Sequence, residues 1–174
     1  MSKNLYEIAV PGFRRRLGVL AHLLDKAEAH FRVRGRDLAE LTTLRLAPDM
    51  NPFPFQIEAA INNTVGAAAR LRGLPAPRVE GLATLADMRR AVTDALETLD
   101  GLEPDDFEGS ETREIVLPSP KGARHFQGFD YLLTLALPNL HFHTAIAYAL
   151  QRAEGVEIGK RDFLGELPPR RPPA

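Results

Sequence analysis

The sequence predicts an all-α protein, a four-helix bundle with a short β-hairpin between the third and fourth helices. Apolar residues recur every three or four positions in four long segments, and prolines and glycines cluster between them. The helical period disappears between residues 104 and 128. With 174 residues, 44% of them hydrophobic, the chain can fill one core. We therefore expect a single domain over residues 1–165, followed by a disordered proline-rich tail at 166–174.

The first helix has the clearest amphipathic pattern and ends near Gly35. Its apolar positions fall on one face, and they are Phe13, Leu17, Leu20, Leu24, Ala27 and Phe31. Pro11 comes just before this pattern. We expect Pro11 in the first turn, where a missing N–H has no partner to lose.

A proline-rich connection at residues 47–54 separates the first two long helices, because proline removes a donor and disfavours helix before it. Residues 55–71 predict the second helix, with an apolar face of Ile57, Ile61, Val65, Ala68 and Leu71. A glycine and two prolines at 73–77 end it.

The third helix is predicted to start at Thr84, which forms a capping arrangement with Asp87, and to stop at Gly101. Residues 114–117 and 124–126 are short extended runs on either side of a turn-rich linker, a pattern typical of a hairpin.

The fourth helix is predicted over residues 128–154, where Pro138 should kink it. Residues 131–150 form the most apolar later stretch of the chain, but Pro138, Asn139 and two histidines interrupt it. This segment therefore predicts a buried helix and no membrane span.

Composition narrows the possible functions. The 22 basic and 23 acidic residues nearly cancel, so no nucleic-acid partner is expected. The absence of cysteine excludes disulfides, thiolate metal sites and a cysteine nucleophile. The first residues lack a secretory pattern, and a cytoplasmic location is expected by default. There is no phosphate loop, nucleophile elbow or His-Glu-x-x-His pair.

The polar residues of interest lie on the second and fourth helices. His141 and His143 are two apart and diverge by roughly 200 degrees on a helix, so they do not share one metal. Asn139 and His143 are four apart and project from one face. A histidine paired with an amide is the simpler interpretation of this pair.

Asp49 in the proline-rich connection and Gln56 on the second helix complete the set of candidates. Helices that face each other in a bundle can line one cavity. We therefore predict a ligand pocket made of Asp49, Gln56, Asn139 and His143. The remaining histidines, His22, His30 and His125, are interpreted as surface residues.

Four segments of the chain resemble the DUF1993 family. They are residues 46–50 (LAPDM), 66–71 (GAAARL), 137–139 (LPN) with His143, and 155–165 (GVEIGKRDFLG). The resemblance covers nearly the whole chain, and its last segment is the most specific. It implies a place in the DinB/YfiT-like superfamily of four-helix-bundle proteins, which are regarded as metal-dependent but have no settled activity in this family.

The superfamily's usual metal site takes one histidine from the second helix and two, four residues apart, from the last long helix. The final histidine is followed nine residues later by arginine and twelve later by glycine, a spacing that His143, Arg152 and Gly155 reproduce. Asn139 stands where the other histidine is expected, and the second helix contains none. Two of three ligands are absent, so we predict no cofactor. Zinc or nickel would require His143 with Asp49 or Gln56.

Three functions are consistent with these observations. The favoured one is a small-molecule-binding protein, a DinB-like bundle without a complete three-histidine metal site. The first alternative is a metal-dependent enzyme acting on a small molecule such as a thiol, with His143 as ligand or general base. The second alternative is a structural dimerisation module. A homodimer is expected under each of the three functions.

Overall fold

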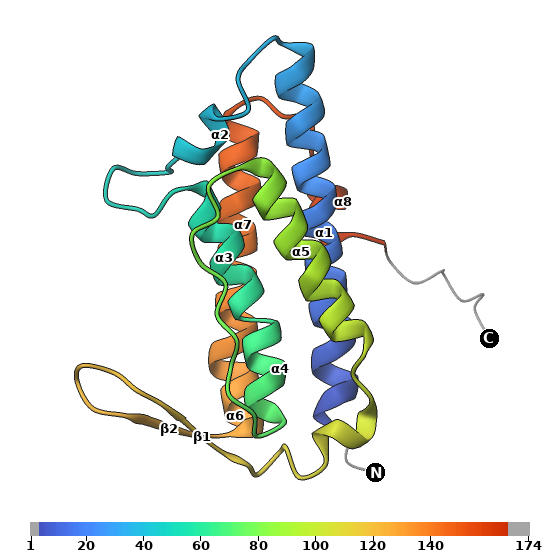
Figure 1. Cartoon of the computed structure of the whole chain (residues 1–174), viewed down its shortest axis with the longest axis vertical. Coiled ribbons are helices and arrows are strands. Elements are labelled where there is room, and N and C mark those ends of the chain that lie inside the picture. Colours follow the sequence, from blue (N-terminus) through green and yellow to red (C-terminus); the bar gives the residue numbers. More distant parts are fainter. Residues whose placement is uncertain (1–3, 167–174) are drawn as a thin grey trace, which may run out of the picture.

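The structure, a computed structural model, describes residues 4–166. It is mostly helical with one small antiparallel sheet (Figure 1). The elements in chain order are α1 Leu5–Val33, α2 Glu40–Thr43, α3 Phe53–Asn62, α4 Val65–Leu71, α5 Leu85–Asp100, η1 Pro104–Phe107, β1 Glu114–Leu117, β2 Arg124–Gln127, α6 Gly128–Tyr131, η2 Leu132–Ala136, α7 Leu137–Ala153 and α8 Lys160–Leu164. Residues 167–174 of the predicted tail lie outside the described residues.

The long helices pack side by side. Helix α1 contacts α5 and α7, and α3 contacts α7 and α5 (Figure 1). Their facing sides bury one main apolar cluster that draws on all four helices. A satellite cluster of Val19, Leu23, Val156 and Ile158 joins α1 to the chain after α7. Among residues 4–166, no helix combines the length and apolarity needed to cross a bilayer.

Helix α1 begins earlier than predicted. The Asn4 side chain caps it by accepting a hydrogen bond from the Tyr6 N–H at 2.9 Å. Pro11 consequently lies inside the helix, so its predicted first-turn position was wrong. Pro11 and Glu7 are both exposed, and the Glu7 carbonyl that loses its donor is on the side facing water.

The predicted second helix is two helices, α3 and α4, separated by a turn at residues 63–64. The side chains at this turn compete for backbone carbonyls. Asn63 donates from Nδ2 to the Ala59 carbonyl at 2.8 Å, and Thr64 donates from Oγ1 to the Ile61 carbonyl at 2.7 Å. Such local bonds weaken a continuous helix, and they explain the break that the apolar period does not reveal.

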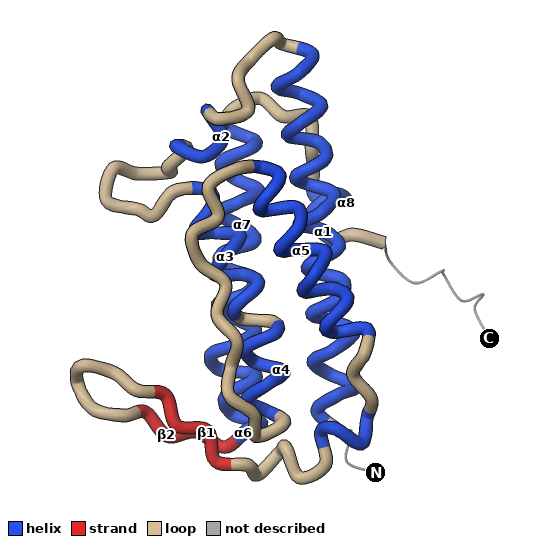
Figure 2. The backbone as a smooth tube through the Cα atoms, viewed as in Figure 1, coloured by secondary structure: helices blue, strands red, loops and turns tan. Residues whose placement is uncertain are grey.

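Helix α5 and the hairpin follow their sequence signals. Thr84 accepts from the Asp87 N–H, Asp87 accepts from the Thr84 N–H, and Gly101 caps the other end. Strands β1 and β2 pair antiparallel, with Glu114 opposite Gln127. The hairpin projects from one end of the helices (Figure 2). Its predicted position between the third and fourth helices is confirmed.

The predicted fourth helix is continuous over residues 128–153, as α6, the π-helical segment η2 and α7. A π-helical turn, η2, lies between α6 and α7, and the Leu137 N–H donates to the Leu132 carbonyl five residues back. Pro138 lies in the first turn of α7. Because proline has no N–H to give, the wider π turn accommodates it at the start of α7.

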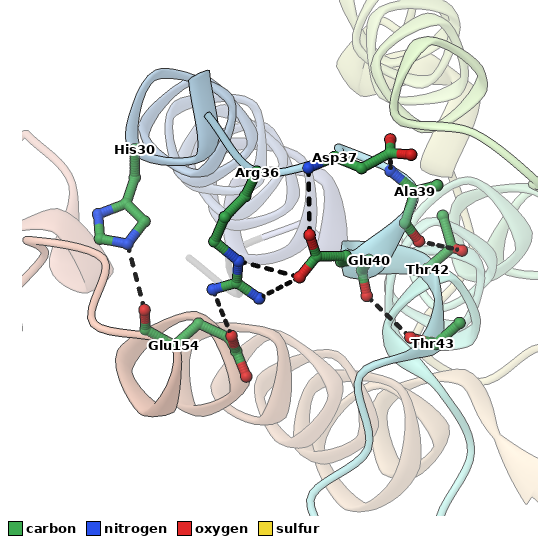
Figure 3. A network of polar contacts seen from close by, with 8 residues as sticks. All are labelled: His30, Arg36, Asp37, Ala39, Glu40, Thr42, Thr43 and Glu154. Atoms are coloured by element: carbon green, nitrogen blue, oxygen red, sulfur yellow. Dashed lines mark hydrogen bonds and ion pairs between the residues drawn. The ribbon is translucent and has the colours of Figure 1, made fainter. Parts of the chain in front are cut away.

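Arg36 links the loop after α1 to the end of α7 through hydrogen bonds and ion pairs (Figure 3). Its guanidinium donates to the Glu40 carboxylate, and its Nη1 donates to Glu154 at 2.7 Å. The same group lies 4.2 Å from the centre of the Phe31 ring. His30 adds a contact to the Glu154 carbonyl at 3.2 Å. These contacts hold one end of α7 against α1.

Replacing Gly128 with alanine should destabilise the fold, because the added Cβ would clash with the backbone carbonyl of Ser110. We expect a loss of about 2 kcal/mol in the free energy of unfolding, the usual size of an overpacking penalty. Gly12→Ala is the matched control, since a Cβ there meets nothing within 4 Å in an exposed helical position. It should gain roughly 0.5–1 kcal/mol. Equal denaturation midpoints for the two variants would contradict this account.

Candidate functional site

Gln56 and His143 meet between α3 and α7. Gln56 lies on the buried side of α3 and is 2% exposed, while His143 is half-buried on α7. The His143 Nδ1 and the Gln56 Oε1 are 2.9 Å apart, although the two residues are 87 positions apart in the chain. The sequence predicts an amide partner for His143 but favours Asn139, whereas in the structure the amide is that of Gln56.

A second hydrogen bond fixes which way the Gln56 amide points. Its Nε2 donates to the Asn51 carbonyl at 2.9 Å, in the loop that leads into α3. A carbonyl oxygen only accepts, so Oε1 must be the atom that faces His143. Nδ1 of His143 is then the donor, and in the neutral ring Nε2 keeps a lone pair.

The neutral form of His143 is favoured by its surroundings, since burial lowers the pKa of the imidazole below its ordinary value. In residues 4–166, the buried side-chain nitrogen and oxygen atoms that lack a partner belong to Arg16, Arg72, Arg89, Ser110 and Gln151. Nε2 of His143 is not among them, and it has no hydrogen bond in that range. It therefore has access to solvent.

Two aromatic rings flank the imidazole edge-on. The centre of the Phe55 ring is 5.9 Å from that of His143, and the Phe142 ring is 5.3 Å away. Phe142 is 54% exposed and Phe55 is 38% exposed, so both have free apolar surface. His143 therefore has an accessible acceptor nitrogen and two partly exposed aromatic rings in contact with its own ring.

The other two predicted pocket residues are not hydrogen-bonded to this pair. Asn139 is half-buried on α7, but its Nδ2 donates to the Leu135 carbonyl, four residues earlier in the chain, at 2.8 Å. Asp49 is exposed in the loop before α3, and its carboxylate makes no hydrogen bond or ion pair with residues 4–166. The structure thus joins two of the four predicted residues.

The donor atoms here do not fit a zinc or nickel centre. Such a centre needs several imidazole, thiolate or carboxylate ligands. No group of three or more His, Cys, Asp or Glu side chains converges within the described part of the chain. At the Gln56–His143 pair, the only imidazole lone pair is on Nε2, and the nearby amide oxygen already accepts a hydrogen bond from Nδ1.

Arg152 and Gly155 have a structural role in the region described. Arg152 donates from Nη1 to the Val156 carbonyl at 3.0 Å, and the Val156 N–H returns to the Gln151 carbonyl at 3.0 Å. Gly155 has φ +81, the left-handed conformation that ends helices and favours glycine. Both residues therefore serve to end α7.

The other histidines contact separate parts of the structure. His141 is exposed as a whole residue, but the surrounding protein partly desolvates its ring, and this lowers the pKa of the imidazole, followed in effect by the Arg16 charge. His125 pairs with Glu114 on the hairpin, at 2.8 Å. His22 pairs with Asp162 at 2.7 Å across 140 positions. The sequence does not predict the His22–Asp162 pair, because no local pattern connects α1 with the far end of the chain.

A family model and a solved structure each match nearly the whole chain. The model of the family described as "Domain of unknown function (DUF1993)" matches residues 5–164. The chain is also similar to the crystal structure of a DinB family member protein from Shewanella denitrificans, with 34% sequence identity and a TM-score of 0.90. That match covers 97% of this chain and 96% of the other. A search of curated proteins gave no significant match.

Lowering the pH should destabilise the protein through His143. Its pKa is lowered in the folded state, whereas the unfolded chain has the ordinary value of 6.5, so the unfolded state binds the proton more tightly. The contribution of the neutral ring is complete above that value and is lost as the pH falls through the folded-state pKa. In denaturant titrations across this window, the free energy of unfolding should fall less for His143→Gln than for the wild type.

Identical pH slopes for the wild type and His143→Gln would show that the histidine is not held neutral by burial.

Proposed function

The chain belongs to the DUF1993 family and is related to DinB family proteins, and from this premise we propose that it is a small-molecule-binding protein. In this proposal the packing of α1, α3, α5 and α7 is a four-helix bundle of the DinB type, forming a single domain. The three-histidine metal site of the superfamily is incomplete in this chain, and its place is taken by a polar pocket.

The Gln56–His143 hydrogen bond carries the proposal. Gln56 is held from both sides, so the His143 ring is oriented before any ligand arrives. Nε2 then accepts one hydrogen bond from the ligand. Phe55 and Phe142 cover an apolar or aromatic part of it. The ligand class is a small molecule that joins a donor group to a flat apolar body.

An enzyme is the second candidate, and the protonation state of His143 favours it. A neutral imidazole with an accessible Nε2 and a proton fixed on Nδ1 is the form a general base requires. The substrate would be a thiol or another small proton donor. A metal-dependent version needs ligands beyond His143, from Asp49 or Gln56, and the donor set argues against it.

A dimerisation module is the third candidate. Apolar side chains remain exposed on the segment from α6 to α7, among them Phe129 at 44%, Leu133 at 42% and Phe142 at 54%. A homodimer that covers them would bury apolar area. In that case the aromatic rings beside His143 would serve association and not ligand binding.

Metal analysis separates the pocket from the metalloenzyme. Protein purified without a histidine tag should contain zinc and nickel well below one equivalent per chain, because one imidazole and neutral amides bind these ions weakly. Stoichiometric metal that disappears in His143→Ala but stays in His141→Ala would overturn the proposal. His141 is the matched control, since it lies two positions away on the same helix and is exposed.

Ligand screening by thermal shift tests the pocket itself. A compound present at 100 times its dissociation constant stabilises the fold by about 2.7 kcal/mol, which corresponds to a rise of roughly 5 °C or more in Tm. We expect such a rise with donor-bearing aromatic compounds, its loss in His143→Ala and its retention in His141→Ala. No rise with any compound, together with a stable dimer by light scattering, would favour the dimerisation module instead.

A further inference from the structure

A groove of about 710 Å³ lies along α1 and the chain from α8 to Glu166, and it shares no lining residue with the Gln56–His143 pair. Helix α8 packs against α1 (Figure 1). Two glycines line the groove. A Cβ at Gly18 would meet nothing within 4 Å, and Gly165 has φ +71 with Val19 only 3.0 Å from the position of a Cβ. Larger side chains at these positions would narrow the groove.

Well-formed contacts hold the wall made by α8. Asp162 accepts the Gly159 N–H at 2.7 Å and pairs with His22 at 2.7 Å. Arg16, which is 8% exposed, donates to the Phe163 carbonyl at 2.7 Å and lies 4.6 Å from the centre of the Phe163 ring. The groove is thus preformed between two fixed elements.

Some of the charged side chains that line the groove form ion pairs among the described residues and others do not. The Asp162 carboxylate is already paired, and its pKa is lowered, first by the hydrogen bond from His22 and then by the one from Gly159. Arg15 and Arg161 make no ion pair within residues 4–166. Glu166 is the one lining acid there without such a pair. Two free guanidinium groups against one free carboxylate give the groove a positive surplus.

We propose that this groove binds a small organic anion, a carboxylate attached to an apolar group. Arg15 and Arg161 hold the carboxylate, since guanidinium groups match its geometry. The apolar group lies over the two glycines, and Val19, which is 3% exposed, adds only a small apolar surface. Glu166 opposes the anion and limits its affinity.

Titration of the full chain with phenylacetate tests the proposal. In 15N-labelled protein, the backbone amide signals of Gly18 and Gly165 should move in a saturable manner. The neutral isostere phenylacetamide and the small anion acetate should each bind more weakly, because each lacks one half of the recognised chemistry. Added salt should weaken phenylacetate binding, as expected for partly exposed charges.

Variants distinguish a specific binding site from nonspecific association. The double change Arg15→Gln with Arg161→Gln should weaken phenylacetate binding about fivefold, in keeping with solvent-exposed ion pairs. Glu166→Gln should strengthen it, and Arg124→Gln on the hairpin should leave it unchanged. Dispersed amide spectra would show that each variant folds. Equal binding of phenylacetate and phenylacetamide, or wild-type affinity in the double variant, would overturn the proposal.

Discussion

The hydrogen bond between Gln56 and His143 is the constraint on which the candidate site depends. It crosses from α3 to α7 at a partly buried position, where the Gln56 amide, 2% exposed, would cost free energy if it were unpaired. The Asn51 carbonyl occupies the other end of the amide, so the loop before α3, helix α3 and helix α7 are tied through one side chain. The same arrangement sets the tautomer of His143 and leaves Nε2 as its accessible atom.

The parts of the fold that sequence predicts well are those with local causes. Thr84, Asp87 and Gly101 begin and end α5 by contacts within a few residues, and the hairpin follows from two extended runs around a turn. The pairing of His143 with an amide was also predictable, since buried polar groups find partners. Which amide it would be was not, because Asn139 satisfies its own helix instead.

The features that sequence misses depend on competition or on distant contacts. Asn63 and Thr64 divide a helix whose apolar period continues through the break, and the His22–Asp162 pair joins positions 140 apart. Gly155 illustrates a third case. Its spacing from His143 looks like part of a metal motif, whereas its left-handed φ shows that it ends α7. Spacing alone does not distinguish a ligand motif from a helix terminus.

The tautomer of His143 is the most direct measurement of the central claim. Long-range 1H–15N correlation spectra at neutral pH, assigned by comparison with His143→Gln, report which ring nitrogen carries the proton. The account predicts a neutral ring with the proton on Nδ1 and an unprotonated Nε2, and Gln56→Leu should abolish that preference. A ring protonated on Nε2, or the same Nδ1 form in Gln56→Leu, would contradict it.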